Sequence, residues 1–343
     1  MRIAPDDWRH ALLNRWQRDF PLERAPFARI GSALGRSEDE VLDACRALQQ
    51  GGALSRIGGI FAAGAGGAAL LAAMAVPAAR LEAVAALVSA HPGVNHNYER
   101  EHRFNLWFVV TGRDGAALER VLRSLEQATG LAALRLPMLR AYRIDLGFDL
   151  QRPLAPARVR RSASGADLSL AASDWPLAAL VEDGLPLLAR PFDAWAQALG
   201  RPPQAVIDAL AGWLAAGALR RFGCIVRHHE LGFAANAMTV FDVPNALVDA
   251  CGAALAQVPG VTLAYRRERA AGWPYNLYCM VHGRERAEVL AVLRQAVPRC
   301  GLAGVPQAVL FSRRRFKQTG AWRFRELPAG APAPHTEGRH VAA

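Results

Sequence analysis

Seven consecutive residues carry most of the ionisable chemistry in the first half of the chain, from His96 to His102 (HNYEREH). Alternate side chains of a β-strand share one face, so we expect His96, Tyr98, Arg100 and His102 to point the same way. Two imidazoles, a phenol and a guanidinium on one surface could bind an anion and move protons. The alternative is a polar edge strand with ordinary surface charge, which for a single histidine would be the better interpretation.

A second cluster, Arg227-His228-His229-Glu230, lies in the other half of the chain. Two adjacent histidines cannot readily chelate one ion, and no histidine stands four residues away, so we expect no metal site here. These imidazoles could still donate protons, or one of them could contact the iron of a tetrapyrrole. A solvated loop is the alternative.

A third group combines arginines with aromatic residues between positions 265 and 276. Guanidinium groups beside Trp and Tyr suit a flat aromatic ligand with anionic side chains. The alternative is a basic hairpin with aromatic residues in the core. The candidate binding residues of this group are Tyr265, Arg266, Arg267, Trp273 and Asn276.

The three groups lie on a tandem duplication. Residues 26–61 reappear at 191–226 without a gap, and residues 92–112 reappear at 259–283. Two copies are too few for a solenoid, so we expect a scaffold used twice. The copies differ mainly in their ionisable residues, and these differences indicate where the chemistry lies. The retained pairs are Tyr98/Tyr265 and Arg100/Arg267, and the changed pairs are His96/Leu263 and His102/Arg269. The residues aligned with Arg227-His228-His229-Glu230 are Ala62, Ala63, Gly64 and Ala65.

Each copy begins with a helix-turn-helix pattern and a β-wing, followed by strands and helices in the order βαββαβ of a ferredoxin-like sandwich. Ser37 and Glu40 form a capping box at the start of a helix that runs to Gln50. The wings are expected at 54–61 and 219–226, and the last strand of the first copy at 138–147. We therefore predict an α+β fold, a tandem repeat of winged helix-turn-helix plus ferredoxin-like domains whose sheets pair as a pseudo-dimer within one chain. The expected boundaries are 1–62 and 63–149 for the first half, 150–173 for a linker, 174–227 and 228–325 for the second half, and 326–343 for a disordered tail.

The formal net charge is +11, and Lys317 is the only lysine, so almost all of the positive charge comes from arginine. A basic balance indicates an acidic partner, namely nucleic acid, anionic lipid or a polycarboxylate. Arginine also favours bidentate recognition of carboxylate or phosphate. Arginine-rich composition equally accompanies GC-rich coding, which remains the neutral explanation.

The helix-turn-helix units lack the residues of a DNA reader. The first recognition helix carries Arg46 as its one base, and the second carries none. Acids near phosphates repel, and binding by counterion release needs cations. We therefore expect a retained fold whose DNA function is lost. The acids of the first recognition helix are Glu38, Asp39, Glu40 and Asp43.

Residues 57–79 carry no charge and are long enough to span a bilayer. They are nevertheless rich in Gly and Ala, they contain Pro77, and their counterpart in the second copy contains Arg227 and Glu230. A membrane span is therefore rejected. The 5 cysteines form no CxxC pair and the N-terminal residues have no apolar signal core, so we expect a cytoplasmic protein with reduced thiols.

The helix-turn-helix followed by βαββαβ resembles the Lrp/AsnC regulator family. More specifically, the chain resembles siroheme decarboxylases, the NirD and NirL/G/H proteins of haem d1 biosynthesis and the related Ahb pair. The first copy is similar to a NirD-type subunit and the second to a NirL/G/H-type subunit. The stretches that carry this resemblance are GVNHNYEREHRFNLWFV, LSRIGGIF, RRFGCIVRHHELGFAANAMTVFDVP and WPYNLYCMVHG.

The resemblance implies removal of the C12 and C18 acetate carboxylates of siroheme to give 12,18-didecarboxysiroheme. It implies no added cofactor and no protein-bound metal, because the iron belongs to the substrate. Arginines would orient the substrate through its carboxylates, the macrocycle would act as electron sink, and an imidazolium would protonate the methylene carbon. The implied carboxylate-binding residues are Arg100, Arg227, Arg266 and Arg267, and the implied proton donors are His96, His102, His228 and His229.

The expected partners are siroheme and its product, without nucleic acid or membrane, and further oligomerisation is left open. Two alternatives remain, a ligand-sensing transcription regulator of the Lrp/AsnC type and a tetrapyrrole carrier without catalysis. The sequence leaves open which half holds the active pocket, the order of the two decarboxylations, and whether a histidine ligates the iron.

Overall fold

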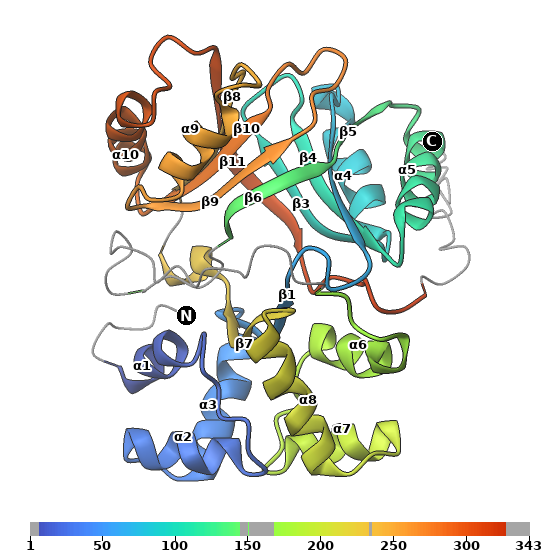
Figure 1. Ribbon diagram of the computed structural model, residues 1–343, viewed down its shortest axis with the longest axis vertical. Helices are drawn as coiled ribbons and strands as arrows, with labels where there is room; N and C mark the ends of the chain where they lie inside the picture. Colours follow the sequence, from blue (N-terminus) through green and yellow to red (C-terminus); the bar gives the residue numbers. More distant parts are fainter. Residues whose placement is uncertain (1–6, 145–149, 151–167, 233–234, 327–343) are drawn as a thin grey trace, which may run out of the picture.

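The computed structural model describes residues 7–144, 150, 168–232 and 235–326. The chain forms two layers (Figure 1). The helix-turn-helix units of both copies lie together in one layer, and the β-sheets of both copies lie together in the other. The copies are therefore interleaved rather than placed side by side as two separate globules.

The helix-turn-helix layer contains the elements expected from the sequence. In the first unit Ser37 accepts a hydrogen bond from the backbone N–H of Glu40, and the Glu40 carboxylate accepts one from Ser37 N–H, so the predicted capping box is confirmed. The elements of the first unit are α1 (Trp8–Arg15), α2 (Pro26–Leu34), α3 (Glu38–Gln50) and β1 (Leu54–Phe61). Those of the second are η2 (Ala172–Asp174), α6 (Trp175–Asp183), α7 (Pro191–Leu199), α8 (Pro203–Ala216) and β7 (Leu219–Val226).

The two wings, β1 and β7, pair with each other as an antiparallel ribbon in which Gly58 lies opposite Gly223. A side chain at Gly223 would place its Cβ 2.3 Å from the carbonyl oxygen of Trp16, at the end of α1, so glycine lets the helical part of the first unit pack directly on the ribbon. One hydrophobic core, including Phe27 and Phe192, spans both units. The wings thus join the two units.

The sheet layer consists of nine strands in the order β5-β2-β4-β3-β11-β8-β10-β9-β6. Neighbouring strands are antiparallel throughout. The first copy supplies β2 (Ala68–Met74), η1 (Ala78–Arg80), α4 (Leu81–Ala90), β3 (Val94–Arg100), β4 (Leu106–Gly112), α5 (Gly115–Thr129), β5 (Ala133–Leu136) and β6 (Met138–Ile144). The second supplies η3 (His228–Leu231), β8 (Ala235–Phe241), α9 (Val248–Leu255), β9 (Val261–Arg267), β10 (Leu277–Gly283), α10 (Arg286–Arg299) and β11 (Gln307–Gln318).

Each copy lends the end of its last strand to the sheet of the other copy. Strand β11 pairs with β8 of its own copy through residues 307–311 and with β3 of the first copy through residues 312–318. In the same way β5 pairs with β2, whereas β6, separated from it by Pro137, pairs with β9 of the second copy. This exchange confirms the predicted pseudo-dimer and gives it a physical basis.

Helices α4 and α5 cover the outer face of the first copy's half of the sheet. Helices α9 and α10 cover the outer face of the second copy's half (Figure 1). The inner faces enclose a separate cluster to which both copies contribute, including Trp107, Met238, Trp273 and Tyr278. Side chains in this cluster therefore lie between the two copies.

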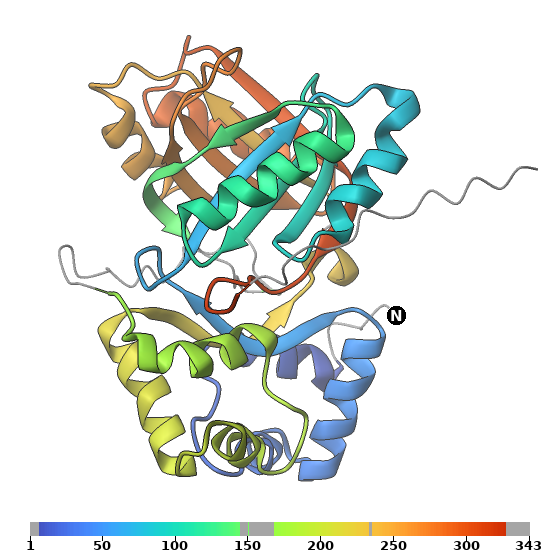
Figure 2. The same cartoon turned by 90° about the vertical axis from the view of Figure 1, so that its right-hand side faces the viewer.

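The segment after β11 ties the two layers together (Figure 2). Trp322 N–H donates to the hydroxyl of Thr111 in the sheet layer, 3.0 Å away. Arg323 then binds the buried carboxylate of Glu182 on α6 at 3.0 Å, and Phe324 enters the core of the helix-turn-helix layer. These contacts fix how the wings face the sheets.

The fold class and the order of elements agree with the sequence prediction, with one strand missed. The first copy's last strand, expected at 138–147, is preceded by the short β5, and its described part ends at Ile144. The linker and the tail lie largely outside the described residues. Among the helices that the structure describes, none is long and apolar enough to cross a bilayer.

Candidate active site

The inner face of β3 carries three of the predicted residues. His96 lies opposite Val109 and Tyr98 opposite Trp107 on β4, and both partners belong to the inner cluster. The intervening Asn97 points outward and donates to the carbonyl of Ala85 on α4, 3.1 Å away. The predicted alternation is therefore confirmed for His96, Tyr98 and Arg100.

His96 and Tyr98 are in direct contact, with 3.2 Å between His96 Nδ1 and the Tyr98 hydroxyl. Burial, together with the positive charges of Arg56 and Arg315, lowers the pKa of His96 to about 4. Burial raises the pKa of Tyr98, so this phenol keeps its proton at neutral pH. Without an anionic ligand the pair is therefore a neutral imidazole beside a neutral phenol.

Arg100 is buried with 6% of its surface exposed. Its Nη1 donates to the carbonyl of Leu310 at 3.1 Å, and its guanidinium lies 5.6 Å from the ring centre of Tyr98. Among the described residues it forms no ion pair with a carboxylate, and burial lowers its pKa. A buried cation without a counter-ion is costly, so this position favours an anionic ligand.

The wing ends bring further cations to the same place. Arg315 on β11 lies opposite Tyr98 and binds Glu230 at 2.7 Å. Arg227, directly after β7, donates to the carbonyl of Gly52 at 3.1 Å and contributes to the positive field at Tyr98. The cluster Arg227–Glu230 and the cluster on β3, predicted from different halves, therefore meet in one region.

His228 and His229 belong to the short helix η3 between Arg227 and Glu230. Arg227 adds to the positive field at Tyr98, and Glu230 binds Arg315, the residue opposite Tyr98. The backbone of η3 therefore lies at the candidate site, whereas the two imidazoles fall outside what the structure describes. Their predicted role stays a prediction.

A second imidazole, which the sequence analysis did not select, lies on the inner face of β10. His282 continues the alternation of Tyr278 and Met280, both in the inner cluster, and its Nδ1 is 2.9 Å from the Thr262 hydroxyl. Burial and the charge of Arg100 lower the pKa of His282 to about 4. Arg100 thus lies near His282 and over the ring of Tyr98, the residue that contacts His96.

The prediction that His102 shares the face of His96 is wrong. Strand β3 ends at Arg100, and His102 lies in the turn that leads to β4, where its Nδ1 accepts a hydrogen bond from Phe104 N–H at 3.1 Å. Its ring packs edge-on against Trp273, 5.2 Å between centres. Burial and the charge of Arg103 lower its pKa.

The third predicted group is divided between structural positions. Trp273 is 1% exposed and donates to the Tyr278 hydroxyl at 2.7 Å. The Asn276 side chain, 2% exposed, is bonded to both the N–H and the carbonyl of Val243. These two side chains already have partners within the protein, and Trp273 packs on Trp107, the residue opposite Tyr98.

The remaining members of that group lie on β9. Tyr265 stacks on Tyr278, and Arg267 lies 4.7 Å above the Tyr265 ring while donating to the carbonyl of Leu136. Arg266 points toward the helix-covered face, where it is 3.7 Å from Asp249 on α9. Arg266 and Arg267 therefore project from opposite faces of the sheet, although both line a hollow of about 320 Å³ together with Arg269 and Asn276.

In the second copy, Tyr265 and Arg267 occupy the positions that correspond to Tyr98 and Arg100. The residues around them differ from those at β3. Ala141 lies opposite Tyr265 on β6, where Arg315 lies opposite Tyr98 on β11. His96 and His282 correspond to Leu263 and Thr111. Of the two related positions, the one at β3 therefore holds the imidazoles and the surplus positive charge.

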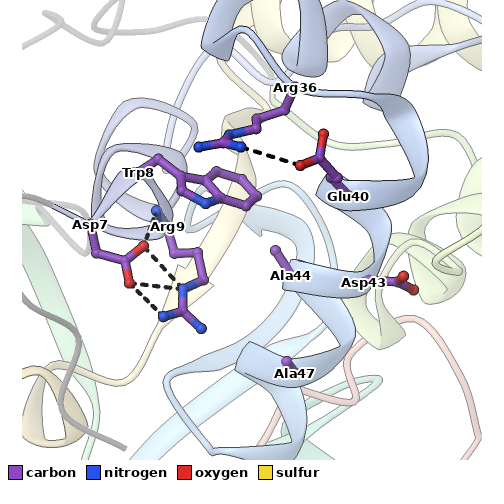
Figure 3. A pocket seen from close by; sticks show the side chains of 8 residues that line it. All are labelled: Asp7, Trp8, Arg9, Arg36, Glu40, Asp43, Ala44 and Ala47. Carbon is purple, nitrogen blue, oxygen red and sulfur yellow. Dashed lines mark hydrogen bonds and ion pairs between the residues drawn. The ribbon is translucent and has the colours of Figure 1, made fainter.

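A surface hollow of about 770 Å³ lies elsewhere, between α1 and α3 of the first helix-turn-helix unit (Figure 3). Its charges are already paired, Asp7 with Arg9 and Arg36 with Glu40, and Arg36 lies over Trp8. It has no imidazole in its lining. This hollow therefore does not share the chemistry of the β3 site.

Comparisons with known proteins agree with the fold. Residues 9–54 match the family model of the siroheme decarboxylase NirDL-like HTH domain, and residues 64–143 and 230–317 match that of the AsnC-like ligand binding domain. A siroheme decarboxylase NirDL subunit from Paracoccus pantotrophus is 47% identical over 322 residues, which cover 93% of this chain and 98% of the relative. The chain belongs to the siroheme decarboxylase family.

Two solved members of the family show the same fold. The crystal structure of the siroheme decarboxylase NirDL aligns with a TM-score of 0.65 at 27% identity, covering 92% of this chain and 94% of that chain. A crystal structure of NirDL in co-complex with an iron-uroporphyrin III analogue aligns with a TM-score of 0.63 at 26% identity, covering 92% and 93%. That family member thus binds an iron tetrapyrrole analogue.

Sequence reasoning missed three residues of this site, Arg56, His282 and Arg315. Arg315 was visible only as part of a basic run, because its place beside Tyr98 depends on pairing between copies. His282 lies near the end of an apolar strand, where a single histidine forms no cluster with other ionisable residues in the sequence. The signal available for His282 was the alignment of the copies, in which it replaces Thr111.

The two low histidine pKa values predict an acid-sensitive fold. Both groups bind a proton near pH 6.5 when unfolded but only near pH 4 when folded, so the unfolded state binds more protons as the pH falls below 6.5. Each histidine should therefore reduce the free energy of unfolding by about 2 kcal/mol between about pH 7 and pH 5. Urea titrations of the wild type, His96→Gln and His282→Gln at both pH values check this. A pH dependence unchanged in both variants would contradict it.

Proposed function

We propose that this protein is a siroheme decarboxylase that removes the C12 and C18 acetate carboxylates of siroheme, giving 12,18-didecarboxysiroheme for haem d1 biosynthesis. The observation that carries the proposal is Arg100, a buried cation without a carboxylate partner among the described residues. Its guanidinium lies over the ring of Tyr98, which contacts His96, and its charge adds to burial in lowering the pKa of His282. A polycarboxylate is the ligand that such a site lacks. Family membership supports the same reaction.

Substrate binding would change the protonation of the site. Burial is the main cause of the low pKa of His96, and the positive charges of Arg56 and Arg315 lower it further. The carboxylates of siroheme offset these charges and give the imidazolium a counter-ion. An opposite charge nearby favours the charged form of an imidazole. His96 therefore gains a proton when the substrate binds. The imidazolium that protonates the methylene carbon is present only in the complex with siroheme.

The chemical step is balanced without a further reactant. The bond between the acetate methylene and its carboxylate breaks, CO2 leaves, and the electron pair passes into the conjugated macrocycle. The imidazolium of His96 then gives its proton to the methylene carbon, which becomes a methyl group. His96 returns to its neutral form, in contact with the Tyr98 hydroxyl that holds its ring.

The distribution of groups favours one catalytic site for both carboxylates. The related position at β9 has Leu263 in place of His96 and Ala141 in place of Arg315. Both acetates must then visit the same histidine in turn, so the macrocycle reorients, or leaves and returns, between the two steps. The proposed active site is therefore the one at β3, in the NirD-like half, with Arg227 and η3 contributed by the other half.

An anaerobic incubation with siroheme tests the proposal. We expect mass spectrometry to detect a product that has lost one CO2 and then one that has lost two, with CO2 released in matching amounts. Binding of siroheme without a change in its mass would replace the enzyme by a carrier. A specific shift of promoter DNA without turnover would replace it by a regulator.

A further inference from the structure

Arg56 lies on the wing β1 but reaches the sheet layer. A Cβ built on Gly320 would lie 3.4 Å from the guanidinium carbon of Arg56. Gly320 follows the end of β11 by two residues, and Gln318 at that end is the pairing partner of His96. The guanidinium therefore extends from the helix-turn-helix layer to the residues after β11, the strand that pairs with β3 at His96.

The acids near Arg56 are bound by other arginines. Glu182 is 3.0 Å from Arg323, and Asp183 is 2.7 Å from Arg325. Within the described part of the chain, the buried Nε of Arg56 has no hydrogen-bond partner. Leaving a buried guanidinium N–H unpaired costs free energy, so a ligand that accepts this hydrogen bond would be stabilised here.

The surroundings of Arg56 leave positive charge in excess. Burial lowers the pKa of Arg56, Glu182 and Asp183 counteract this, and the charges of Arg227 and Arg323 lower the pKa further. Arg315 adds a further positive charge near the His96–Tyr98 pair. Glu230 binds Arg315, whereas neither Arg56 nor Arg227 forms an ion pair with a described carboxylate. The region between the wings and β3 is therefore electrostatically suited to a ligand with several carboxylates.

We propose that the wing of the first helix-turn-helix unit is part of the substrate site, and that Arg56 binds a peripheral carboxylate of the macrocycle that is not being removed. This inference rests on the proposed function and assigns a role to a layer that has lost the residues of a DNA reader. The paired wings serve as the floor of the site, with Arg56 as an orienting group.

Arg56→Gln tests this role, with iron-uroporphyrin III as the probe of binding and siroheme as the substrate. A hydrogen bond to a charged group contributes about 1.5–3 kcal/mol, so the Kd for the probe and the KM for siroheme should rise about 10- to 100-fold. The value of kcat should change by less than about 3-fold, because Arg56 does not touch the reacting carbon. Arg56→Lys keeps the charge but loses the planar, two-pronged guanidinium. Its Kd and KM should therefore lie between those of the wild type and those of Arg56→Gln.

The matched control is Arg46→Gln, which removes an exposed arginine of the same unit that pairs with Asp43 on α3. It should leave Kd and KM unchanged, and thermal melting of each variant shows whether the fold is retained. The inference is overturned if the wild type binds the probe and decarboxylates siroheme while Arg56→Gln keeps wild-type Kd and KM. A wild type that neither binds nor decarboxylates would instead remove the proposed function, and this inference with it.

Discussion

Replacing His96 by leucine, the residue at the related position of the second copy, is expected to lower kcat for CO2 release by about 100- to 10,000-fold. The expected cause is loss of the proton donor to the methylene carbon, since Leu263 marks the position where the second copy lacks this group. Binding of iron-uroporphyrin III should weaken little, because the arginines remain. Single-turnover measurements of CO2 release, with siroheme prebound, separate the chemical step from binding.

His91→Leu is the control for loss of one imidazole in the same layer, because His91 lies at the end of α4 and its Nδ1 accepts the N–H of Gly93. We expect this variant to keep wild-type turnover. Wild-type single-turnover rates in His96→Leu would remove His96 from the mechanism and transfer attention to His228 and His229. The two η3 histidines would then need the same substitution.

Arg100→Met is expected to abolish most activity without weakening the fold. Charge-assisted contacts to one carboxylate contribute about 1.5–3 kcal/mol, and misplacement of the reacting acetate adds to this, so kcat/KM should fall at least about 100-fold. Replacing a buried charge by an apolar side chain of similar size is often neutral or stabilising. The melting temperature should therefore stay constant or rise while activity is lost.

Arg267→Met removes the corresponding arginine of the second copy and provides the matched comparison. Its surroundings lack the imidazoles, and its Nη1 is bonded to the carbonyl of Leu136. We expect a loss of less than about 10-fold in kcat/KM. Equal losses in the two variants would mean that both related positions act on the substrate, and the single-site account would fail.

The sequence predicted the elements well because local patterns determine them. A period of two along residues 94–100 places His96, Tyr98 and Arg100 on one face, and the structure agrees. The prediction failed at His102 because the strand ends at Arg100, where the chain turns into β4, and no glycine or proline marks that end. Strand ends depend on pairing partners, which a single sequence does not specify.

The composition of the site could not be predicted because it depends on pairing between copies. Arg315 meets Tyr98 only after β11 crosses from the sheet of its own copy to that of the other. Arg56 reaches the same place only because the wings pair and the segment after β11 ties the layers together. The duplication showed which residues differ between the copies. It did not show that the β3 residues of the first copy and the Arg227–Glu230 cluster of the second copy lie in one region.

The location of the substrate is the most direct test of the account. A crystal structure of this protein with iron-uroporphyrin III bound should place the macrocycle between the inner face of β3 and the β1–β7 ribbon. Carboxylates should lie within hydrogen-bond distance of Arg100 and Arg56, with an acetate methylene carbon next to His96. A macrocycle seated against Tyr265 and Arg267, or in the hollow between α1 and α3, would contradict the account.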